Sequence, residues 1–273
     1  MNPIEDLEGY VGKRRAFINA FSWRNIGPTA HCNVDCDMTT ATAYRKNFNE
    51  ERPEAKLTFN DMIIKAAANA LSNHRLYTCA YNGRHGLFPA DTIDIRFPVD
   101  LGDYLGWGMV KNADRKTLAE IAADARAAIE RTRRETPKRT ETWARIARQY
   151  PPVPAVLKGV GFGLRLAGIC FPDLDRWFRT KARSYRGTFL ITNVGPAGIM
   201  RMEGPIVTPD ILHLMITATR KTPVLVEGRV ETRPMMPLVA KFDVRMTDAG
   251  QAAAFLTDVK RNLEDPDHRL GPY

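Results

Sequence analysis

The chain has 273 residues, of which 44% are hydrophobic and 26% are charged, and it carries a net charge of +9. These values exclude disordered, collagen-like and coiled-coil proteins, and the length fits one large domain or two small ones. Four cysteines without paired C-x-x-C spacing are too few for a disulfide scaffold. Because the first 15 residues also lack the apolar stretch of a signal peptide, we expect a cytoplasmic protein.

The spacing of apolar residues predicts a mixture of helices and strands. Thr39 and Thr40 are expected to cap the helix after the first strand, and Thr58 or Asn60 the helix after that. Asn82 and Gly83 mark a turn. Because the elements do not alternate regularly, we expect an α/β two-layer sandwich of mixed sheet and helices. The predicted helices cover 12–23, 58–70, 117–132 and 251–263, and the predicted strands 30–38, 92–99, 187–193, 211–218, 224–227 and 236–243. The strand over 92–99 is expected to be closed by Pro98 and Asp100.

The positive charge is concentrated in one segment. Residues 131–186 contain 14 Lys or Arg and 4 Asp or Glu, so this segment alone carries +10. Such asymmetry indicates an anionic partner, namely a membrane surface, a nucleic acid or a phosphorylated ligand, unless the segment is a solvated basic face. No nucleic-acid recognition motif accompanies the charge, so we expect no nucleic-acid partner.

An apolar, glycine-containing stretch, residues 152–172, lies inside this basic segment. Its only charges, Lys158 and Arg165, are seven residues apart and share one face of a helix. Two charges and four glycines argue against a membrane-spanning helix, whereas the basic and aromatic flanks, with Trp143 and Trp177, are typical of a helix lying in a membrane interface. An amphipathic lid on the protein's own core fits the same pattern, and both interpretations stay open.

The most specific residues lie in the C-terminal half. GTFLITNVGPAGIMRMEGPIVTPD (187–210), GRV (228–230) and LVAKFDVRMTDAGQAAAFLTDVKRNLEDP (238–266) resemble the catalytic domain of the dihydrolipoyl acyltransferases of 2-oxoacid dehydrogenase complexes, whose fold chloramphenicol acetyltransferase shares. Earlier stretches agree in the same order: KRRAFINAF (13–21), PTAHCNVDCDMT (28–39), LTFNDMIIKAAANAL (57–71) and IDIRFPVDLGDYLGWGMVKNADRKTLAEIAADA (93–125). We therefore expect one acyltransferase-type catalytic domain over 1–273, with a basic and apolar insert at about 137–186.

The resemblance implies a homotrimer in which coenzyme A and the acyl acceptor enter a channel between subunits. The chemistry needs a histidine base and a hydroxyl that stabilises the tetrahedral oxyanion. The family signature D-H-R-x-x-D-G corresponds to residues 243–249, where Val244 replaces the histidine and Ala249 the glycine. Because valine cannot transfer a proton, the resemblance predicts a rearranged active site that lacks the usual base.

The same resemblance assigns roles to the remaining site residues. Thr192 supplies the hydroxyl, and Asp248 holds the signature loop against an arginine at Arg14 or Arg15. Asn193 and Arg245 are assigned to substrate binding. No cofactor other than coenzyme A or an acyl-coenzyme A substrate is implied.

The five histidines offer one candidate replacement for the missing base. His31 matches a histidine that the family often has near the channel, where its first expected role is contact with the substrate and its second is catalysis in place of the missing base. It also fits an ordinary, partly buried polar residue. His213 fits a hydrogen-bonded core position. His268 lies in a tail that resembles the C-terminal tail of the family, and His74 and His85 fit loops. Strand alternation places Cys32 on the opposite face from His31, so we expect no metal site.

Two functions remain open. One is an acyltransferase that uses coenzyme A thioesters through proximity and Thr192. The other is a catalytically inactive trimeric scaffold that binds acyl groups or lipid. If the insert binds anionic lipid, the protein would be peripheral at the membrane.

Overall fold

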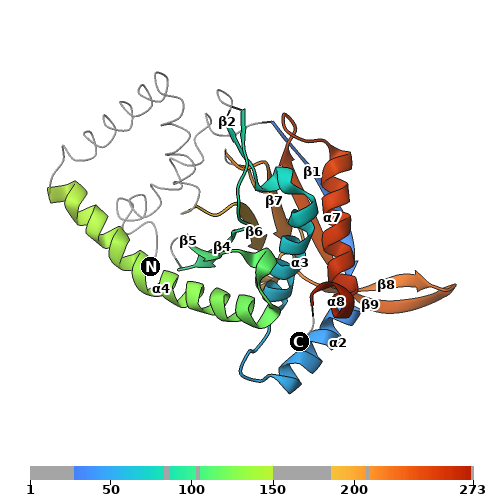
Figure 1. Ribbon diagram of the computed structural model, residues 1–273. Helices are drawn as coiled ribbons and strands as arrows, with labels where there is room; N and C mark the ends of the chain where they lie inside the picture. Colours follow the sequence, from blue (N-terminus) through green and yellow to red (C-terminus); the bar gives the residue numbers. More distant parts are fainter. Residues whose placement is uncertain (1–27, 83–85, 103–104, 150–185, 207–208, 272–273) are drawn as a thin grey trace.

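The computed structural model describes residues 28–82, 86–102, 105–149, 186–206 and 209–271. The helix predicted over 12–23, Arg14, Arg15 and the stretch 152–172 lie outside these residues. A seven-stranded sheet forms the centre (Figure 1), in the order β1-β9-β7-β6-β4-β5 with β8 paired to β9. Its strands are β1 (Thr29–Asp37), β4 (Ile95–Asp100), β5 (Leu105–Val110), β6 (Phe189–Asn193), β7 (Leu212–Ile216), β8 (Arg220–Val226) and β9 (Arg229–Asp243). β2 (Ala80–Asn82) and β3 (Gly86–Phe88) form a separate hairpin, consistent with the turn signal between them.

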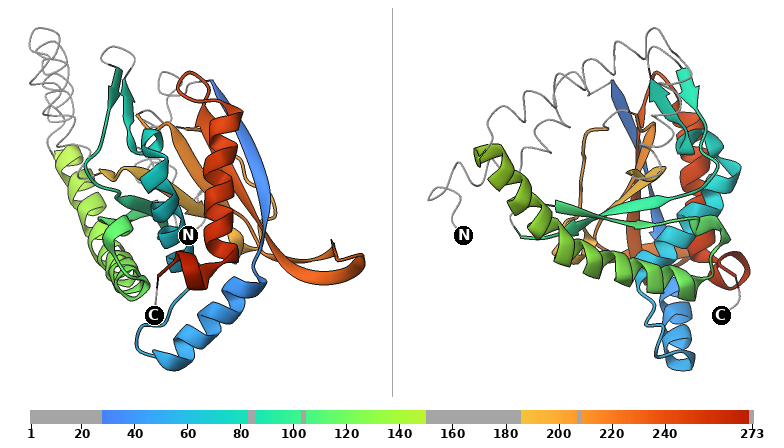
Figure 2. Two further views of the ribbon diagram at one scale, coloured as in Figure 1. Left: turned by 45° about the vertical axis from the view of Figure 1, so that its right-hand side comes forward. Right: turned by 60° about the vertical axis from the view of Figure 1, so that its left-hand side comes forward.

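Helices cover one face of the sheet, as Figure 2 shows. They are α3 (Phe59–Asn73), α4 (Leu118–Gln149) and α7 (Ala249–Glu264), while α2 (Thr39–Glu51) and α8 (Pro266–Arg269) lie at one end. The core between the layers is aromatic and aliphatic, with Phe189 of β6 5.6 Å from Phe255 of α7 between ring centroids. Parallel pairs (β4–β6 and β6–β7) coexist with antiparallel ones, so the expected two-layer α/β sandwich of mixed sheet is confirmed. We call the face turned away from α3, α4 and α7 the outer face.

The helix starts confirm one predicted cap and correct another. Thr58 caps α3 through a reciprocal capping box with Asp61, so Asn60 is not the cap. α2 begins after Met38 without a side-chain cap, and Thr39 and Thr40 lie inside the helix. The expectation that they cap it is wrong because the Asp37 carboxylate accepts hydrogen bonds from the N–H and hydroxyl of Thr39.

Two element boundaries also differ from the prediction. β4 continues through Pro98, which pairs with Trp107 of β5, because the parallel pairing with β6 extends only to Arg96 and Leu190. Proline there removes no N–H that β6 would have used. The helix predicted over 117–132 runs on to Gln149 and contains Pro137, so the expected start of the insert lies within α4.

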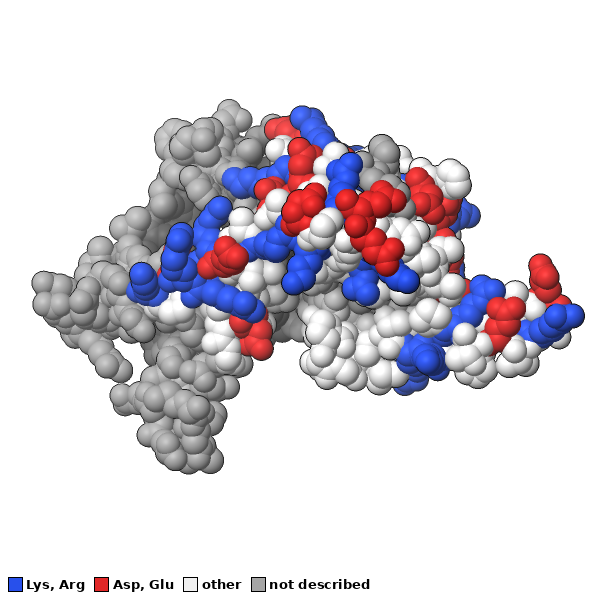
Figure 3. All heavy atoms as spheres, turned by 90° about the horizontal axis from the view of Figure 1, so that it is seen from below, with Lys and Arg blue, Asp and Glu red and all other residues white. Residues whose placement is uncertain are grey.

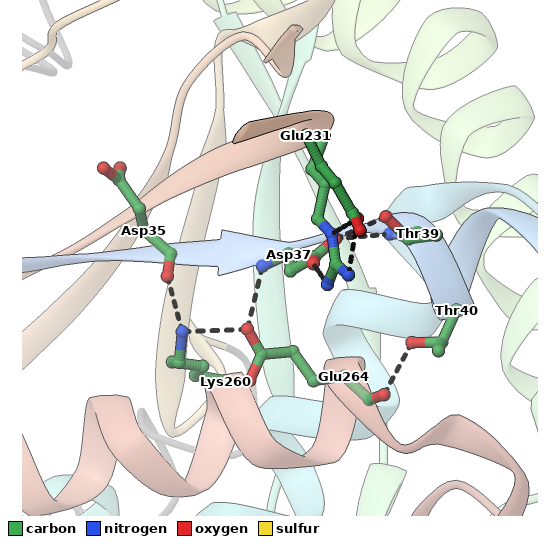
Figure 4. A network of polar contacts seen from close by, with 8 residues as sticks. Asp35, Asp37, Thr39, Thr40, Glu231, Lys260 and Glu264 are labelled. Atoms are coloured by element: carbon green, nitrogen blue, oxygen red, sulfur yellow. Dashed lines mark hydrogen bonds and ion pairs between the residues drawn. The ribbon is translucent and has the colours of Figure 1, made fainter. Parts of the chain in front are cut away.

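The long strand β9 leaves the sheet at its N-terminal end and forms a projecting hairpin with β8 (Figure 1). At the base of the hairpin, Arg233 bonds the carboxylates of Asp37 and Glu231 at 2.8 and 2.9 Å between nitrogen and oxygen. Glu264 of α7 accepts the N–H of Asp37 and pairs with Lys260. Figure 4 shows how this network joins β1, β9 and α7.

Candidate functional site

The signature stretch forms a tight loop after β9. Asp243 is buried, and Arg245 turns back on it with Nη2 2.5 Å from its Oδ2. Burial opposes ionisation of Asp243, but the hydrogen bonds and charge of Arg245 outweigh it and lower the pKa of that carboxyl. The guanidinium of Arg245 also lies 5.3 Å from the ring centroid of Tyr81. Arg245 is therefore held by its own loop and by the β2 strand.

Val244 lies at the surface of this loop. Its N–H donates to the carbonyl of Pro28 at 3.2 Å, and 47% of the residue is exposed. The position where the resemblance expects a base is thus accessible, and an apolar side chain occupies it.

Two residues after Arg245, the loop is fixed to the helical layer. The Tyr77 hydroxyl lies 3.0 Å from the Thr247 hydroxyl, and both residues are buried. Asp248 caps α7 by accepting the N–H of Gln251 at 2.9 Å. Asp248 therefore organises the loop and the helix start, while its expected arginine partners at 14 and 15 lie outside the described residues.

Thr192 and Asn193 end the central strand β6. Thr192 is half-buried and shares the outer face with Met215 of β7. The side chain of Asn193 accepts the N–H of Gly195 at 2.8 Å and donates to Asn60 of α3 at 2.7 Å. Asn193 thus shapes the turn that follows Thr192.

Within one chain, Thr192 and Val244 are far apart. Thr192 pairs with Met215, which pairs with Val239, five residues before Val244 along β9. At the usual rise of about 3.3 Å per residue and spacing of about 4.8 Å per strand, their backbones are about 19 Å apart. The structure does not bring these two sequence-predicted positions together in a single copy.

The histidines and cysteines lie at separate places. His31 is exposed on β1, with Nε2 3.4 Å from Glu203 Oε1, and it is not hydrogen-bonded to Thr192. His268 is exposed in α8 beside Asp265. Cys32 packs against the core on the opposite face from His31, as the alternation predicts. Among the described residues, no group of three or more His, Cys, Asp and Glu is arranged to hold a metal ion.

The outer face carries a charged cluster that the sequence did not predict. His213 is buried in β7, as expected, with Nε2 2.9 Å from Oδ2 of Asp210. The same oxygen accepts a hydrogen bond from Arg96 of β4. Arg96 and Asp210 are 114 positions apart in sequence. The sequence gives only two separate indications: Arg96 is a charge at an outward position of β4, and Asp210 is a charge just before β7.

No helix in the described part of the chain is long and apolar enough to cross a membrane.

Comparisons with known proteins agree with one another. The family model of the 2-oxoacid dehydrogenases acyltransferase (catalytic domain) matches residues 12–143 and 180–270. A Bacillus subtilis dihydrolipoyllysine-residue succinyltransferase component of the 2-oxoglutarate dehydrogenase complex is 28% identical over 86% of this chain and 47% of its own length. The chain thus spans about half the length of the curated relatives that it matches.

Two solved structures show the fold. The Azotobacter vinelandii dihydrolipoamide acetyltransferase superposes with a TM-score of 0.66 at 20% identity, over 96% of this chain and 89% of that one. A chloramphenicol acetyltransferase superposes with a TM-score of 0.52 at 14% identity, over 95% and 97%. The described sandwich therefore has the chloramphenicol acetyltransferase-like fold.

Proposed function

Because this chain belongs to the family of 2-oxoacid dehydrogenase acyltransferases by its catalytic domain, we propose that it binds acyl-coenzyme A thioesters in a channel between copies and transfers the acyl group slowly. The observation that carries the proposal is that the chain keeps a hydroxyl, Thr192, and has an accessible apolar residue, Val244, at the position of the base. Thr192 would stabilise the oxyanion, and proximity would supply much of the remaining acceleration.

The spacing of the site residues supports their assignment. A serine, a histidine and an asparagine have a role in the catalytic mechanism of the Azotobacter enzyme, and the serine lies 52 positions before the histidine and the asparagine four after it. Thr192 and Asp248 stand at the same separations from Val244. The proposed site therefore keeps a hydroxyl and a polar loop residue and loses the imidazole.

The register of the sheet supports a site shared between copies. Thr192 and Val244 are about 19 Å apart in one chain, too far for both to contact the same thioester carbonyl. A second copy placing its own loop 243–248 over Thr192 would complete the site, which agrees with the homotrimer that the resemblance implies. Light scattering tests this directly: a trimer is expected, and a stable monomer in dilute buffer would contradict the shared site.

Thioester turnover tests the activity. Purified protein, acetyl-coenzyme A and dihydrolipoamide should release free coenzyme A slightly faster than a blank without protein. Thr192→Ala should abolish the excess, whereas Thr257→Ala on α7, whose hydroxyl bonds only its own helix at Ala253, should leave it unchanged. Turnover that persists in Thr192→Ala would remove Thr192 from the mechanism.

A second candidate function follows from Val244 itself. A valine 47% exposed at the base position suits a site that binds an acyl group without reacting. In that case the chain is an inactive trimeric scaffold. The turnover assay and a titration of acetyl-coenzyme A binding together distinguish the two, since binding without any turnover above the blank supports the scaffold.

We also propose that the insert at about 137–186 gives the protein a peripheral membrane location. The support is its sequence charge and the exposed basic residues of α4 at its start, namely Arg131, Arg133 and Arg134 before it and Lys138 within it. Figure 3 shows Lys and Arg side chains over the whole described face, with Asp and Glu side chains among them at the end that α4 reaches as well as elsewhere. Each basic residue near an anionic leaflet contributes about 1 kcal/mol. The alternative is a lid, which would alter ligand access without lipid binding.

A further inference from the structure

One histidine of the described chain is both on the outer face and open to solvent. The side chain of His31 on β1 points away from the helical layer and is 43% exposed. His213 shares that face, but its side chain is only 4% exposed and is hydrogen-bonded to Asp210. His74 pairs with a carboxylate of α7 in the helical layer, and His268 belongs to α8. Among the described histidines, only His31 can therefore meet a ligand on the outer face.

A carboxylate lies beside this imidazole. Glu203 Oε1 is 3.4 Å from His31 Nε2, and none of the described residues hydrogen-bonds the other ring nitrogen, Nδ1. A carboxylate at one ring nitrogen orients the ring and stabilises the imidazolium, which leaves the other nitrogen to take up a proton. Lys241 stands directly opposite on β9 and adds a positive charge on the same face, which favours the thiolate form of a nearby thiol. The arrangement is that of a general base.

His31 lies on the same side of the molecule as the position of the missing base. The N–H of Val244 bonds the carbonyl of Pro28, and His31 follows three residues later on β1. At about 3.3 Å per residue, the backbones of His31 and Val244 are about 10 Å apart. Thr192 of the same chain is three strands away, at about 16 Å. His31 therefore belongs, with loop 243–248, to the half of the proposed shared site that faces Thr192 of another copy.

The segment that carries Glu203 follows Thr192 along the chain and crosses the outer face. A Cβ placed on Gly204 would lie 3.3 Å from Cε of Met215, which pairs with Thr192. The neighbouring Glu203 reaches across to His31 on β1. One short segment thus packs beside the strand neighbour of the hydroxyl and also holds the imidazole.

We propose that His31, oriented by Glu203, accepts the proton of the acceptor thiol during the slow acyl transfer; this assignment rests on the proposed function. The proton passes to Nδ1, directly or through one water, as the thiol sulfur bonds to the thioester carbonyl carbon. The bond from that carbon to the coenzyme A sulfur then breaks, and this sulfur takes the proton back from the imidazolium. Because His31 is displaced by about 10 Å from the position of Val244, it contributes less than the 10²–10⁴-fold of a well-placed base.

Release of free coenzyme A from acetyl-coenzyme A and dihydrolipoamide tests the assignment. His31→Ala should lower the turnover above the blank about tenfold. His268→Ala is the matched control, since His268 also pairs with a carboxylate, Asp265, and is 83% exposed; its turnover should equal that of the wild type. Wild-type turnover that His31→Ala retains overturns the role of His31 and leaves the proposed function standing. Wild-type turnover no higher than the blank overturns both.

Chemical rescue separates proton transfer from a structural role. Added imidazole should restore much of the turnover lost in His31→Ala, because the exposed position leaves room for a small base, and it should leave the wild type unchanged after subtraction of the blank. Glu203→Gln, which keeps the imidazole and removes its carboxylate, should fall between the wild type and His31→Ala. If His31→Ala fails to fold, Glu203→Gln decides. No rescue of folded His31→Ala, or full turnover in Glu203→Gln, overturns the proposal.

Discussion

Replacing Asp210 by asparagine removes the buried carboxylate that pairs with Arg96 and is hydrogen-bonded to His213. Breaking a buried ion pair by removing one partner costs about 3–5 kcal/mol, because the other charge stays buried. We therefore expect Asp210→Asn to lower the free energy of unfolding by about 3 kcal/mol at pH 7.

The pH dependence of this loss is fixed by the depressed pKa. The Asp210 carboxyl has a pKa of about 2 in the folded chain against a reference value of 3.8. A carboxyl whose pKa is lower in the folded than in the unfolded state stabilises the protein at pH values above its unfolded-state pKa. This contribution disappears as pH falls through the folded-state pKa. At 1.36 kcal/mol per unit, the contribution is about 2.5 kcal/mol. The gap between wild type and Asp210→Asn should be widest near neutral pH and nearly close at pH 2.

Urea unfolding followed by tryptophan fluorescence from pH 7 to pH 2 measures this gap, at one protein concentration because assembly contributes to stability. Asp267→Asn, an exposed carboxylate in α8, is the matched control and should change the free energy of unfolding by less than about 0.5 kcal/mol. A gap below about 1 kcal/mol at pH 7, or one that does not narrow toward pH 2, would refute the reasoning.

Three further changes have defined outcomes. Gly108→Ala should destabilise by about 1–3 kcal/mol because its Cβ would lie 2.4 Å from Phe97 Cε2; an unchanged urea midpoint would show that the ring moves aside freely. Thr58→Ala should lower the free energy of unfolding by about 1 kcal/mol because the capping box is lost. A decrease of less than a few tenths of a kcal/mol in the same urea titration would contradict that cap. The wild type should pellet with vesicles that contain anionic lipid at low salt. It should not pellet at high salt, and neither should a variant that lacks residues 152–172. No pelleting of the wild type at low salt rules out membrane binding and leaves the interpretation of the insert as a lid.

Sequence patterns predicted the layers because alternation and helical periodicity record which side chains meet the core. β1 illustrates this, with Cys32 and Cys36 inward and His31 outward. The predicted strand over 236–243 is the inner half of β9, whose outer half pairs only with β8 and carries the exposed Val230. A strand with no buried face leaves no alternating signal, so the hairpin could not be delimited.

The candidate site likewise contains residues that the sequence could predict and contacts that it could not. Val244 was found from the sequence because a seven-residue signature fixes its place, and Asp248 because it belongs to the same signature; the structure adds that it caps α7. The Arg96–Asp210 pair joins a residue of β4 to the segment before β7, 114 positions away, and no local pattern indicates such a contact. The separation of Thr192 from Val244 likewise depends on strand order, which sequence periodicity does not contain.

The rate of acyl transfer by Val244→His tests the central claim most directly, because it restores an imidazole to a loop that otherwise keeps Asp243, Arg245 and Asp248. A general base contributes about 10²–10⁴-fold, so the account predicts that Val244→His transfers acetyl groups from acetyl-coenzyme A to dihydrolipoamide at least about 100-fold faster than the wild type. Val244→Ala, which changes the same exposed position without adding a base, should match the wild type. Equal rates for the wild type and Val244→His, both well above the blank, would contradict the account, since the base would then lie elsewhere.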